Sequence, residues 1–252
     1  MSSKVFADQV VVVTGGGTGI GRAAALAFAE QGAASVIITG RRAEPLAQAA
    51  AEHPALVPVV ADVTRPEGAE AVAAAVAERG GQLDVLVHNA GVFAEIPLDD
   101  LNADEVRRQL EINVVGPVLL TGRLLPLFTS PGASVVVVSS ISSRLAAPGH
   151  SVYAASKAAV DSLIRSWAVE LAPKGIRVNG VAPGNVETDI LGVGGVTPDR
   201  ISEWREGYAA TVPAGRIGGV ADITSWITRL AEPASSWVTG EIITVDGGRL
   251  LV

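Results

Sequence analysis

Tyr153 and Lys157 are the two side chains whose types and spacing are best suited to proton transfer. In a helix, residues four apart lie on the same face, so the phenol and the ammonium would be neighbours. A free tyrosine has a pKa of about 10, which is too high for a base near neutral pH. Two unit charges about 4 Å apart interact by about 4 kcal/mol at an effective dielectric constant of about 20, which could lower that pKa by at most about three units. The pair could therefore exchange a proton with a carbonyl or alcohol oxygen, although the same spacing also occurs by chance on surface helices.

Ser139 and Ser140 end a valine-rich run, residues 134–139, which we predict to be a buried strand. In open α/β sheets, ligands bind at the carboxyl ends of the strands. A hydroxyl group at that place could hold a substrate oxygen. The simpler interpretation is that both serines cap the turn after the strand.

A glycine-rich turn lies between a short apolar run, residues 10–13, and an alanine-rich segment typical of a helix. Glycines permit a tight turn, and a helix N-terminus offers free N–H groups and a positive dipole end to a pyrophosphate. The spacing is G-x-x-x-G-x-G. Because the turn joins a predicted strand to a predicted helix, we favour dinucleotide binding over a purely structural turn. The residues expected to line the cofactor here are Gly15, Gly17, Thr18, Gly19, Ile20 and Gly21.

Arg41 and Arg42 follow the second predicted strand. A carboxylate at this place would bind the adenosine ribose hydroxyls and repel a 2′-phosphate. A guanidinium can instead pair with a 2′-phosphate and stack on adenine. The sequence therefore favours NADP(H), while NAD(H) remains open because both arginines could simply be solvated.

The alternation of strand-like and helix-like segments predicts how these residues are brought together. Strands spaced by helices indicate βαβ units with right-handed crossovers. We therefore predict an α/β fold: a single Rossmann-like, doubly wound domain covering residues 1–252, with a seven-stranded parallel sheet flanked by helices. The predicted strands are 10–13, 36–39, 56–60, 83–88, 134–139, 176–181 and 242–245, and the predicted helices are 22–31, 44–52, 66–78, 103–125 with a kink at Gly116-Pro117, and 154–172. Residues 185–216 interrupt the alternation and are predicted to form a flap over the site, with a short helix at 201–208.

Composition excludes several other classes of protein. The 252 residues are 48% hydrophobic and 18% charged, which supplies a sizeable core. The net charge is −7 without a long basic run, so we expect no nucleic-acid partner. There are no cysteines and the three histidines are widely spaced, so we expect neither disulfides nor a metal site.

Targeting signals are also not expected. Residues 1–9 lack the apolar core of a signal peptide. The uncharged stretch 124–143 is broken by prolines, a glycine and serines, so we interpret it as a helix end, a turn and a strand, not as a membrane span. We expect a cytoplasmic protein without a membrane partner.

Taken together, the motifs resemble the short-chain dehydrogenase/reductase family, in the form whose chains are about as long as this one. The resemblance covers nearly the whole sequence. The matching pieces are Thr14–Gly21, Asp62-Val63, Asn89-Ala90-Gly91, Asn113, Ser140, Tyr153-x-x-x-Lys157, Pro183-Gly184, Thr188 and Val245-Asp246-Gly247-Gly248.

The resemblance implies hydride transfer between a nicotinamide and a carbonyl or secondary alcohol, with four catalytic residues. Tyr153 would be the acid/base, and Lys157 would lower its pKa and bind the nicotinamide ribose. Ser140 would orient and polarise the substrate oxygen. Asn113 would hold a water that links Lys157 to solvent.

The resemblance also implies the remaining contacts. Further cofactor-binding residues would be Asp62, Val63, Asn89, Ala90, Gly91, Pro183, Gly184, Val186 and Thr188. Residues expected near the substrate, which the apolar flap suggests is apolar and of moderate size, are Ser142, Arg144, His150 and Asn185. The C-terminal strand would help to form a homotetramer, or else a homodimer.

Two departures from the family pattern leave alternatives open. His88 stands where many members have Asn, and we expect a hydrogen-bonded packing role for it. Thr18 stands where many NADP-preferring members have Arg or Lys, which leaves Arg41 and Arg42 to carry that preference. Besides NADPH-dependent ketone reduction, an NAD-dependent alcohol dehydrogenase and a non-catalytic dinucleotide sensor therefore remain alternatives. The complete set of four catalytic residues argues against the sensor.

Overall fold

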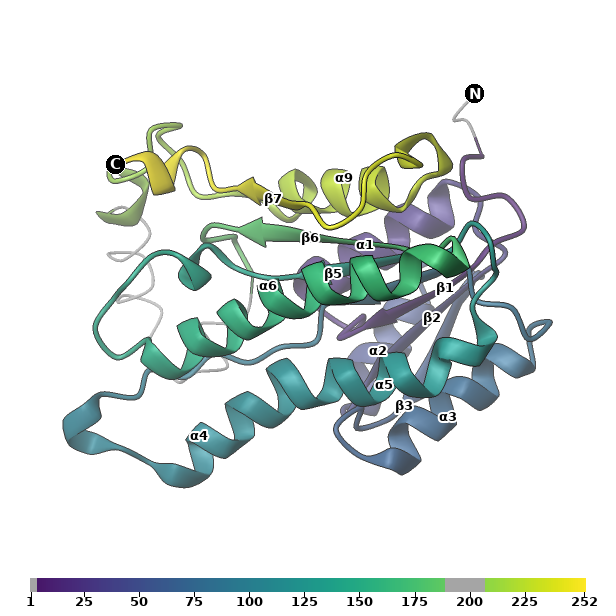
Figure 1. The fold of residues 1–252 in the computed structure, drawn as a ribbon, viewed down its shortest axis with the longest axis horizontal. Helices are drawn as coiled ribbons and strands as arrows, with labels where there is room; N and C mark the ends of the chain where they lie inside the picture. The colour runs from purple at the N-terminus through teal and green to yellow at the C-terminus, as the bar shows by residue number, and fades with distance from the viewer. Residues whose placement is uncertain (1–3, 189–206) are drawn as a thin grey trace.

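All seven strands form one parallel sheet. The computed structural model describes residues 4–188 and 207–252 (Figure 1). The strands are β1 (Val10–Thr14), β2 (Ser35–Gly40), β3 (Leu56–Val60), β4 (Val85–His88), β5 (Ser134–Val138), β6 (Arg177–Pro183) and β7 (Ile242–Val245). Their order is β3-β2-β1-β4-β5-β6-β7, and every neighbouring pair is parallel. The doubly wound α/β fold predicted from the sequence is confirmed.

The helices cover both faces of this sheet (Figure 1). They are α1 (Gly19–Glu30), α2 (Ala43–Ala50), α3 (Pro66–Ala77), α4 (Ala103–Leu110), α5 (Gly116–Leu124), α6 (Ser151–Leu171) and α9 (Val220–Ala231). Strand β1 shows how the two layers are separated. Val10 and Val12 belong to the core that contains residues of α3, α5 and α6, whereas Val11 and Val13 belong to the core that contains residues of α1, α2 and α9. This alternation is the period of two that a β-strand imposes on its side chains.

Helix α9 is absent from the sequence prediction, which assigned no helix after the flap. Its signals are nevertheless present in the sequence. The carboxylate of Asp222 accepts a hydrogen bond from the Gly219 N–H at the helix start, and Ile223, Ile227 and Leu230 are buried at the spacing of one helical face. Glycines lie on both sides of the segment, with Gly218-Gly219 directly before it, and they obscured this pattern.

The long helix predicted for residues 103–125 is interrupted by a π-helical turn, Glu111–Val115, between α4 and α5. The interruption immediately precedes Gly116-Pro117, where a kink was predicted. Proline has no N–H to donate to the carbonyl of the residue four positions earlier, so the regular ladder cannot continue there. Residues 103–127 are long and apolar enough to cross a membrane by composition alone. The buried core helices of soluble proteins also meet that criterion, so it carries little weight here.

Arg177 on β6 holds the C-terminal end of α9 against the sheet. Its guanidinium donates to the carbonyls of Leu230 (2.7 Å), Ala231 (3.0 Å) and Glu232 (3.2 Å). The last carbonyls of a helix have no partners within the helix, so this side chain supplies donors that the fold otherwise lacks.

We expect Arg177→Met to lower the free energy of unfolding by about 2–3 kcal/mol, because carbonyls that were bound to a charged donor lose it. Urea denaturation measures the change. Arg107→Met is the matched control, since Arg107 is an exposed arginine on α4 that pairs with Asp104, and surface pairs contribute little. Equal losses for the two variants would contradict the capping role.

Candidate active site

The glycine turn and the end of β4 are joined at the carboxyl edge of the sheet. The side-chain amide of Asn89 donates to the carbonyls of Thr14 (3.0 Å) and Gly15 (3.3 Å). The N–H groups of Asn89 and Ala90 each donate to the hydroxyl of Thr14 at 3.0 Å. Strands β1 and β4 are the pair at which the strand order reverses, which is where open α/β sheets bind ligands.

The turn leaves room for a backbone-bound ligand. Gly15 has φ +66°, and a Cβ on Gly21 would lie 2.3 Å from the Gly15 carbonyl oxygen, so larger residues are excluded at both positions. Thr18 precedes α1 in an extended conformation and its side chain makes no capping bond. The first N–H groups of α1 are therefore not capped by that residue. This arrangement fits the pyrophosphate of a dinucleotide.

Thr188 lies against this turn, as expected for a cofactor-binding residue. A Cβ on Gly19 would be 3.3 Å from its Cγ2. The segment is held by a short pairing with residues after the flap, because Val186 pairs with Gly218 and the Glu187 N–H donates to the Gly218 carbonyl at 2.9 Å. Most of the predicted flap, residues 189–206, lies outside the described residues, as does most of its predicted helix.

Arg41 and Arg42 are exposed at the end of β2, next to the place where the adenosine end of a dinucleotide would lie. Asp62, at the end of β3, accepts hydrogen bonds from the N–H (3.0 Å) and hydroxyl (2.7 Å) of Thr64. Burial raises the pKa of Asp62, but these hydrogen bonds and the charge of Arg41 outweigh it, and the net shift is downward. Asp62 is therefore an anion within the electrostatic reach of Arg41.

The four predicted catalytic residues lie near one another, and two of them lie beside Gly91. A Cβ on Gly91 would lie 3.4 Å from Oδ1 of Asn113 and 3.6 Å from Nζ of Lys157. Nζ of Lys157 donates to the Val138 carbonyl at 2.9 Å and lies 5.8 Å from the centroid of the Tyr153 ring. Ser140 forms a hydrogen bond with the Tyr153 hydroxyl. The residues that the sequence placed in one catalytic set are thus close together.

The side chain of Asn113 makes three hydrogen bonds to protein groups. It accepts from the Val92 N–H and donates to the Val92 carbonyl, both at 2.9 Å, and it also donates to the hydroxyl of Ser156 at 3.0 Å. That hydroxyl in turn donates to the Tyr153 carbonyl at 2.7 Å. The amide therefore braces the loop after β4 against α6, which leaves the second lone pair of Oδ1 and the backbone carbonyl of Asn113 as the atoms that would hold a relay water.

The pKa of Tyr153 depends mainly on burial. Burial raises it above the usual value, and only the hydrogen bond with Ser140 acts in the opposite direction. Burial also lowers the pKa of Lys157 to about 8, while the charge of Asp161 opposes that shift. A lowering of the Tyr153 pKa by Lys157 therefore stays a prediction, because Nζ donates to the Val138 carbonyl and lies 5.8 Å from the centroid of the phenol ring.

Asp161 is a buried carboxylate that the sequence analysis did not single out. It lies one helical turn after Lys157 on α6, and its Oδ1 accepts a hydrogen bond from the hydroxyl of Ser139. Both side chains are buried. The sequence signal was an acidic residue on the buried face of a helix, four positions after the lysine.

We expect kcat/KM to fall above pH 8, because a lysine with a pKa of about 8 keeps its charge below that pH and loses it above. Each further pH unit reduces the charged fraction about tenfold. Asp161→Asn removes the charge that raises this pKa, so the fall should begin at lower pH. A pH–rate profile measures the shift, and Asp104→Asn, at an exposed carboxylate on α4, is the control. A profile of the Asp161 variant that overlays the wild type would contradict this role.

His88 has the packing role expected from the sequence. It is buried, and its Nε2 is 2.7 Å from the hydroxyl of Thr121. Burial lowers its pKa to about 3, so the ring is neutral near physiological pH.

The predicted substrate residues occupy different surroundings. The Ser142 N–H donates to the hydroxyl of Ser140 at 3.1 Å, which places Ser142 next to the catalytic set. His150 lies 4.8 Å from the ring of Phe93, a residue that the sequence analysis missed and that also contacts Tyr153. Arg144 instead donates to the hydroxyl of Thr244 on β7 at 2.8 Å. Asn185 accepts from the Gly218 N–H at 3.0 Å through its carbonyl.

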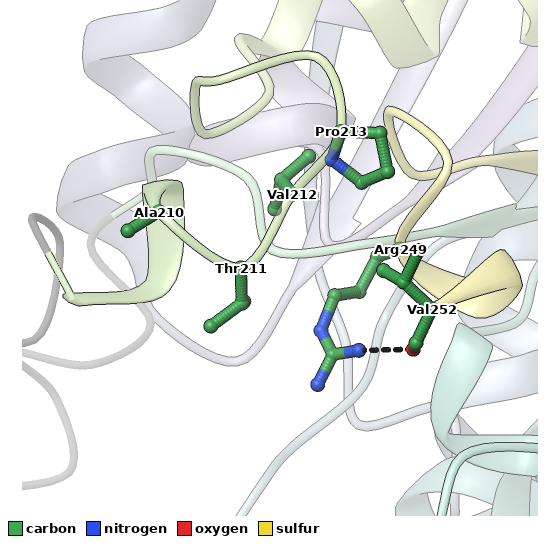
Figure 2. A pocket seen from close by; sticks show the side chains of 6 residues that line it. All are labelled: Ala210, Thr211, Val212, Pro213, Arg249 and Val252. Atoms are coloured by element: carbon green, nitrogen blue, oxygen red, sulfur yellow. Dashed lines mark hydrogen bonds between the residues drawn. The ribbon is translucent and has the colours of Figure 1, made fainter.

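A separate cavity of about 710 Å³ lies near the C-terminus (Figure 2). Its lining residues are Ala210, Thr211, Val212, Pro213, Arg249 and Val252. Arg249 donates to the Val252 carbonyl at 2.8 Å, as the dashed line in Figure 2 marks. Residues 210–213 belong to the predicted flap, whereas none of the predicted catalytic or cofactor-binding residues lines this cavity. Across residues 4–188 and 207–252, no group of three or more histidine or acidic side chains could hold a metal ion.

Comparisons with known proteins agree with this geometry. A family model described as enoyl-(acyl carrier protein) reductase matches residues 15–249. The chain is 40% identical to cis-4-hydroxycyclohexanecarboxylate dehydrogenase of Sinomonas cyclohexanicum, over 97% of this chain and 98% of that protein. It is 34% identical to 3-oxoacyl-(acyl-carrier-protein) reductase FabG of Thermotoga maritima, over 96% and 98%.

A crystal structure of a short-chain dehydrogenase/reductase from Caenorhabditis elegans, solved with its cofactor, superposes with a TM-score of 0.90 at 33% identity, covering 98% of this chain and 97% of the other. The sheet order, the glycine turn and the Tyr–Lys helix are all present in the chain. The chain therefore belongs to the short-chain dehydrogenase/reductase family and is an oxidoreductase that acts on alcohol or carbonyl groups.

Proposed function

We propose that this protein is an NADPH-dependent ketone reductase that moves a hydride between the nicotinamide and a carbonyl or secondary alcohol carbon. The observation that carries the proposal is the cluster of Asn113, Ser140, Tyr153 and Lys157 beside the glycine turn. A bound nicotinamide supplies or accepts the hydride. The rest of the work falls to the chain's own side chains.

The residues divide this work by their chemistry. The hydroxyl of Ser140 holds and polarises the substrate oxygen, and the phenol of Tyr153 gives or takes the proton at that oxygen. The ammonium of Lys157 stabilises the phenolate and binds ribose hydroxyls. Binding of both reactants in one cleft aligns the two carbons and removes much of the entropic barrier.

The preference for NADP(H) is carried by Arg41 and Arg42. Both are exposed, and Arg42 is the residue that precedes α2. No acidic side chain occupies these two positions, so the end of β2 offers two cations to a 2′-phosphate. The alternative is an NAD-dependent alcohol dehydrogenase with the same catalytic set.

A panel of ketones and secondary alcohols, followed at the absorbance band of NADPH in both directions, tests the proposed reaction. Turnover of at least one carbonyl or alcohol supports it, and equal or better rates with NADH favour the NAD-dependent alternative. Tight NADPH binding without turnover across the whole panel would instead indicate a dinucleotide sensor.

We propose that one domain carries both the cofactor and the substrate site and that the protein acts in the cytoplasm. The seven strands of a single sheet support the first statement. The absence of cysteines is compatible with the second. Residues 185–216, together with Ser142, Arg144 and His150, are proposed to surround an apolar substrate of moderate size.

We also propose a homotetramer, because two surfaces expose apolar side chains. One lies on α4, the π-helical turn and α5, and the other lies beside β7, the last strand of the sheet. The exposed apolar residues are Leu110, Val115, Val118 and Leu119 on the first surface and Val169, Trp226 and Trp237 on the second. Trp237 is 99% exposed, which is unusual for the largest apolar side chain.

Light scattering after size-exclusion chromatography should give the mass of four chains. Trp237→Ser combined with Val169→Ser should reduce the assembly to dimers, because it removes the apolar contacts beside β7. Leu98→Ser, at another exposed apolar residue, is the control and should leave the mass unchanged. A wild-type monomer at micromolar concentration would contradict the proposed assembly.

A further inference from the structure

Two side-chain amides on one helix hold the loop that follows β4. Asn113 pairs with both backbone groups of Val92, as described above. Gln109, one helical turn earlier, pairs with both backbone groups of Ala94: it accepts from the Ala94 N–H at 3.2 Å and donates to the Ala94 carbonyl at 3.1 Å. Because the two amides bind every second residue, they act on this loop as a neighbouring strand would.

Gln109 is completely buried, with 0% of its surface exposed. A buried amide without partners would be costly, and its two partners are the backbone groups of Ala94. Both of these side-chain hydrogen bonds of Gln109 go to this loop. Its hydrogen bonds therefore serve the position of the loop.

The residue between the two clamped positions is Phe93. Its ring lies edge-to-face against Tyr153, with centroids 5.2 Å apart and planes at 86°. It lies in the same manner against His150, at 4.8 Å and 64°. The ring is only partly buried, so it presents apolar surface next to the phenol.

A backbone hydrogen bond ties this loop to the segment before α6. The Ile96 N–H donates to the Gly149 carbonyl at 2.8 Å. Gly149 has φ +70°, and a Cβ there would lie 2.5 Å from Cγ of Glu95, so the two segments approach closely. Phe93, His150 and Tyr153 are thus held as one aromatic cluster.

We infer that Phe93 determines substrate specificity and that Gln109 is the positioning residue that holds it, so that the enzyme prefers carbonyl compounds with an aryl or other flat apolar group next to the reacting carbon. The inference rests on the proposed function. With the substrate oxygen between Ser140 and Tyr153, one substituent of the carbonyl carbon must lie beside the phenol, where the Phe93 ring is. Flat π systems pack on such a ring edge or face better than saturated groups do.

Selectivity between two ketones of similar size tests the role of Phe93. The probes are acetophenone and cyclohexyl methyl ketone, which differ in the flat ring. Phe93→Ala should lower the ratio of their kcat/KM values by about 2- to 12-fold, the range that corresponds to one aromatic pair. Phe93→Leu keeps an apolar side chain of moderate size and should lower the ratio as well, which covers the case that the alanine variant fails to fold.

A double-mutant cycle tests whether Gln109 acts through Phe93. Gln109→Leu should raise KM for acetophenone more than it lowers kcat, and should reduce the same selectivity ratio. Combined with Phe93→Ala, it should add little further loss of selectivity, because coupled residues are not additive. Arg107→Ala on the exposed side of α4 is the control.

The possible outcomes distinguish a failure of the proposed function from a failure of the roles of Phe93 and Gln109. If the wild type reduces or oxidises none of the probes in the wider panel, the proposed function fails and this inference fails with it. If the wild type is active but the Phe93 variants keep the wild-type ratio, only the specificity role is overturned. If Gln109→Leu lowers the melting temperature while KM and the ratio stay unchanged, Gln109 is structural and the positioning role is overturned.

Discussion

Replacing Tyr153 by Phe is expected to lower kcat by about 10²- to 10⁴-fold, the usual contribution of a positioned acid/base group. The substitution removes one oxygen atom and leaves the ring. The ring contact with Phe93 at 5.2 Å can therefore persist, and so can the helix around it. The loss should thus lie in the proton transfer and not in the fold.

Steady-state rates with the best substrate of the panel measure the loss of kcat, and fluorescence titration with NADPH measures the affinity for the cofactor. Affinity for the cofactor should change little, since the proposed cofactor contacts of the glycine turn are untouched. Ser225→Ala is a control variant, because Ser225 is an exposed serine on α9, outside the predicted site. Activity near the wild-type level in the Tyr153 variant would falsify the assigned role.

The second large effect is expected at the adenosine end of the cofactor. Arg41→Ala should lower kcat/KM with NADPH by about 10- to 100-fold, because a charge-assisted hydrogen bond to a phosphate contributes about 1.5–3 kcal/mol. With NADH the value should be nearly unchanged or should rise, since NADH has no 2′-phosphate. Adding Arg42→Ala should deepen the loss with NADPH.

Kinetic constants for both cofactors, measured on the wild type, the two single variants and the double variant, decide this question. Arg79→Ala is the matched control. Arg79 lies between the end of α3 and the start of β4, and therefore at the amino ends of the strands, whereas Arg41 follows the carboxyl end of β2. The carboxyl group of Asp62 gives a second measurement. Its pKa should rise in the Arg41 variant, because the charge of Arg41 lowers it. If the double variant keeps its wild-type constants with NADPH, the arginines do not set the preference and the NAD-dependent alternative gains weight.

The order and nature of the elements could be predicted because they depend on short stretches of chain. The four buried valines of β1 predict a strand, and the glycines that follow them predict a tight turn. The same holds for Tyr153 and Lys157, whose four-residue spacing places them on one face of α6. Helix α9 shows the limit of this approach, since its apolar spacing is regular but its surroundings resemble a loop.

The chemistry of the site depended on contacts between distant segments. The pKa of Tyr153 is raised because the fold buries the phenol. This burial cannot be predicted from the charged residues that lie near Tyr153 in the sequence. The clamp between Gln109 and Ala94 joins a helix to a loop fifteen positions earlier. The Ser139–Asp161 bond likewise joins the end of a strand to a helix that comes later in the chain.

The sequence by itself thus determined the family and the parallel α/β architecture, and it predicted which residues form the catalytic set, because these follow from local spacing and from backbone geometry. Only the tertiary structure decided how strongly each group is desolvated, which amides hold Phe93 beside the phenol, and how Asp161 acts on Lys157. These properties arise from burial and from contacts between segments that the chain brings together only when it folds.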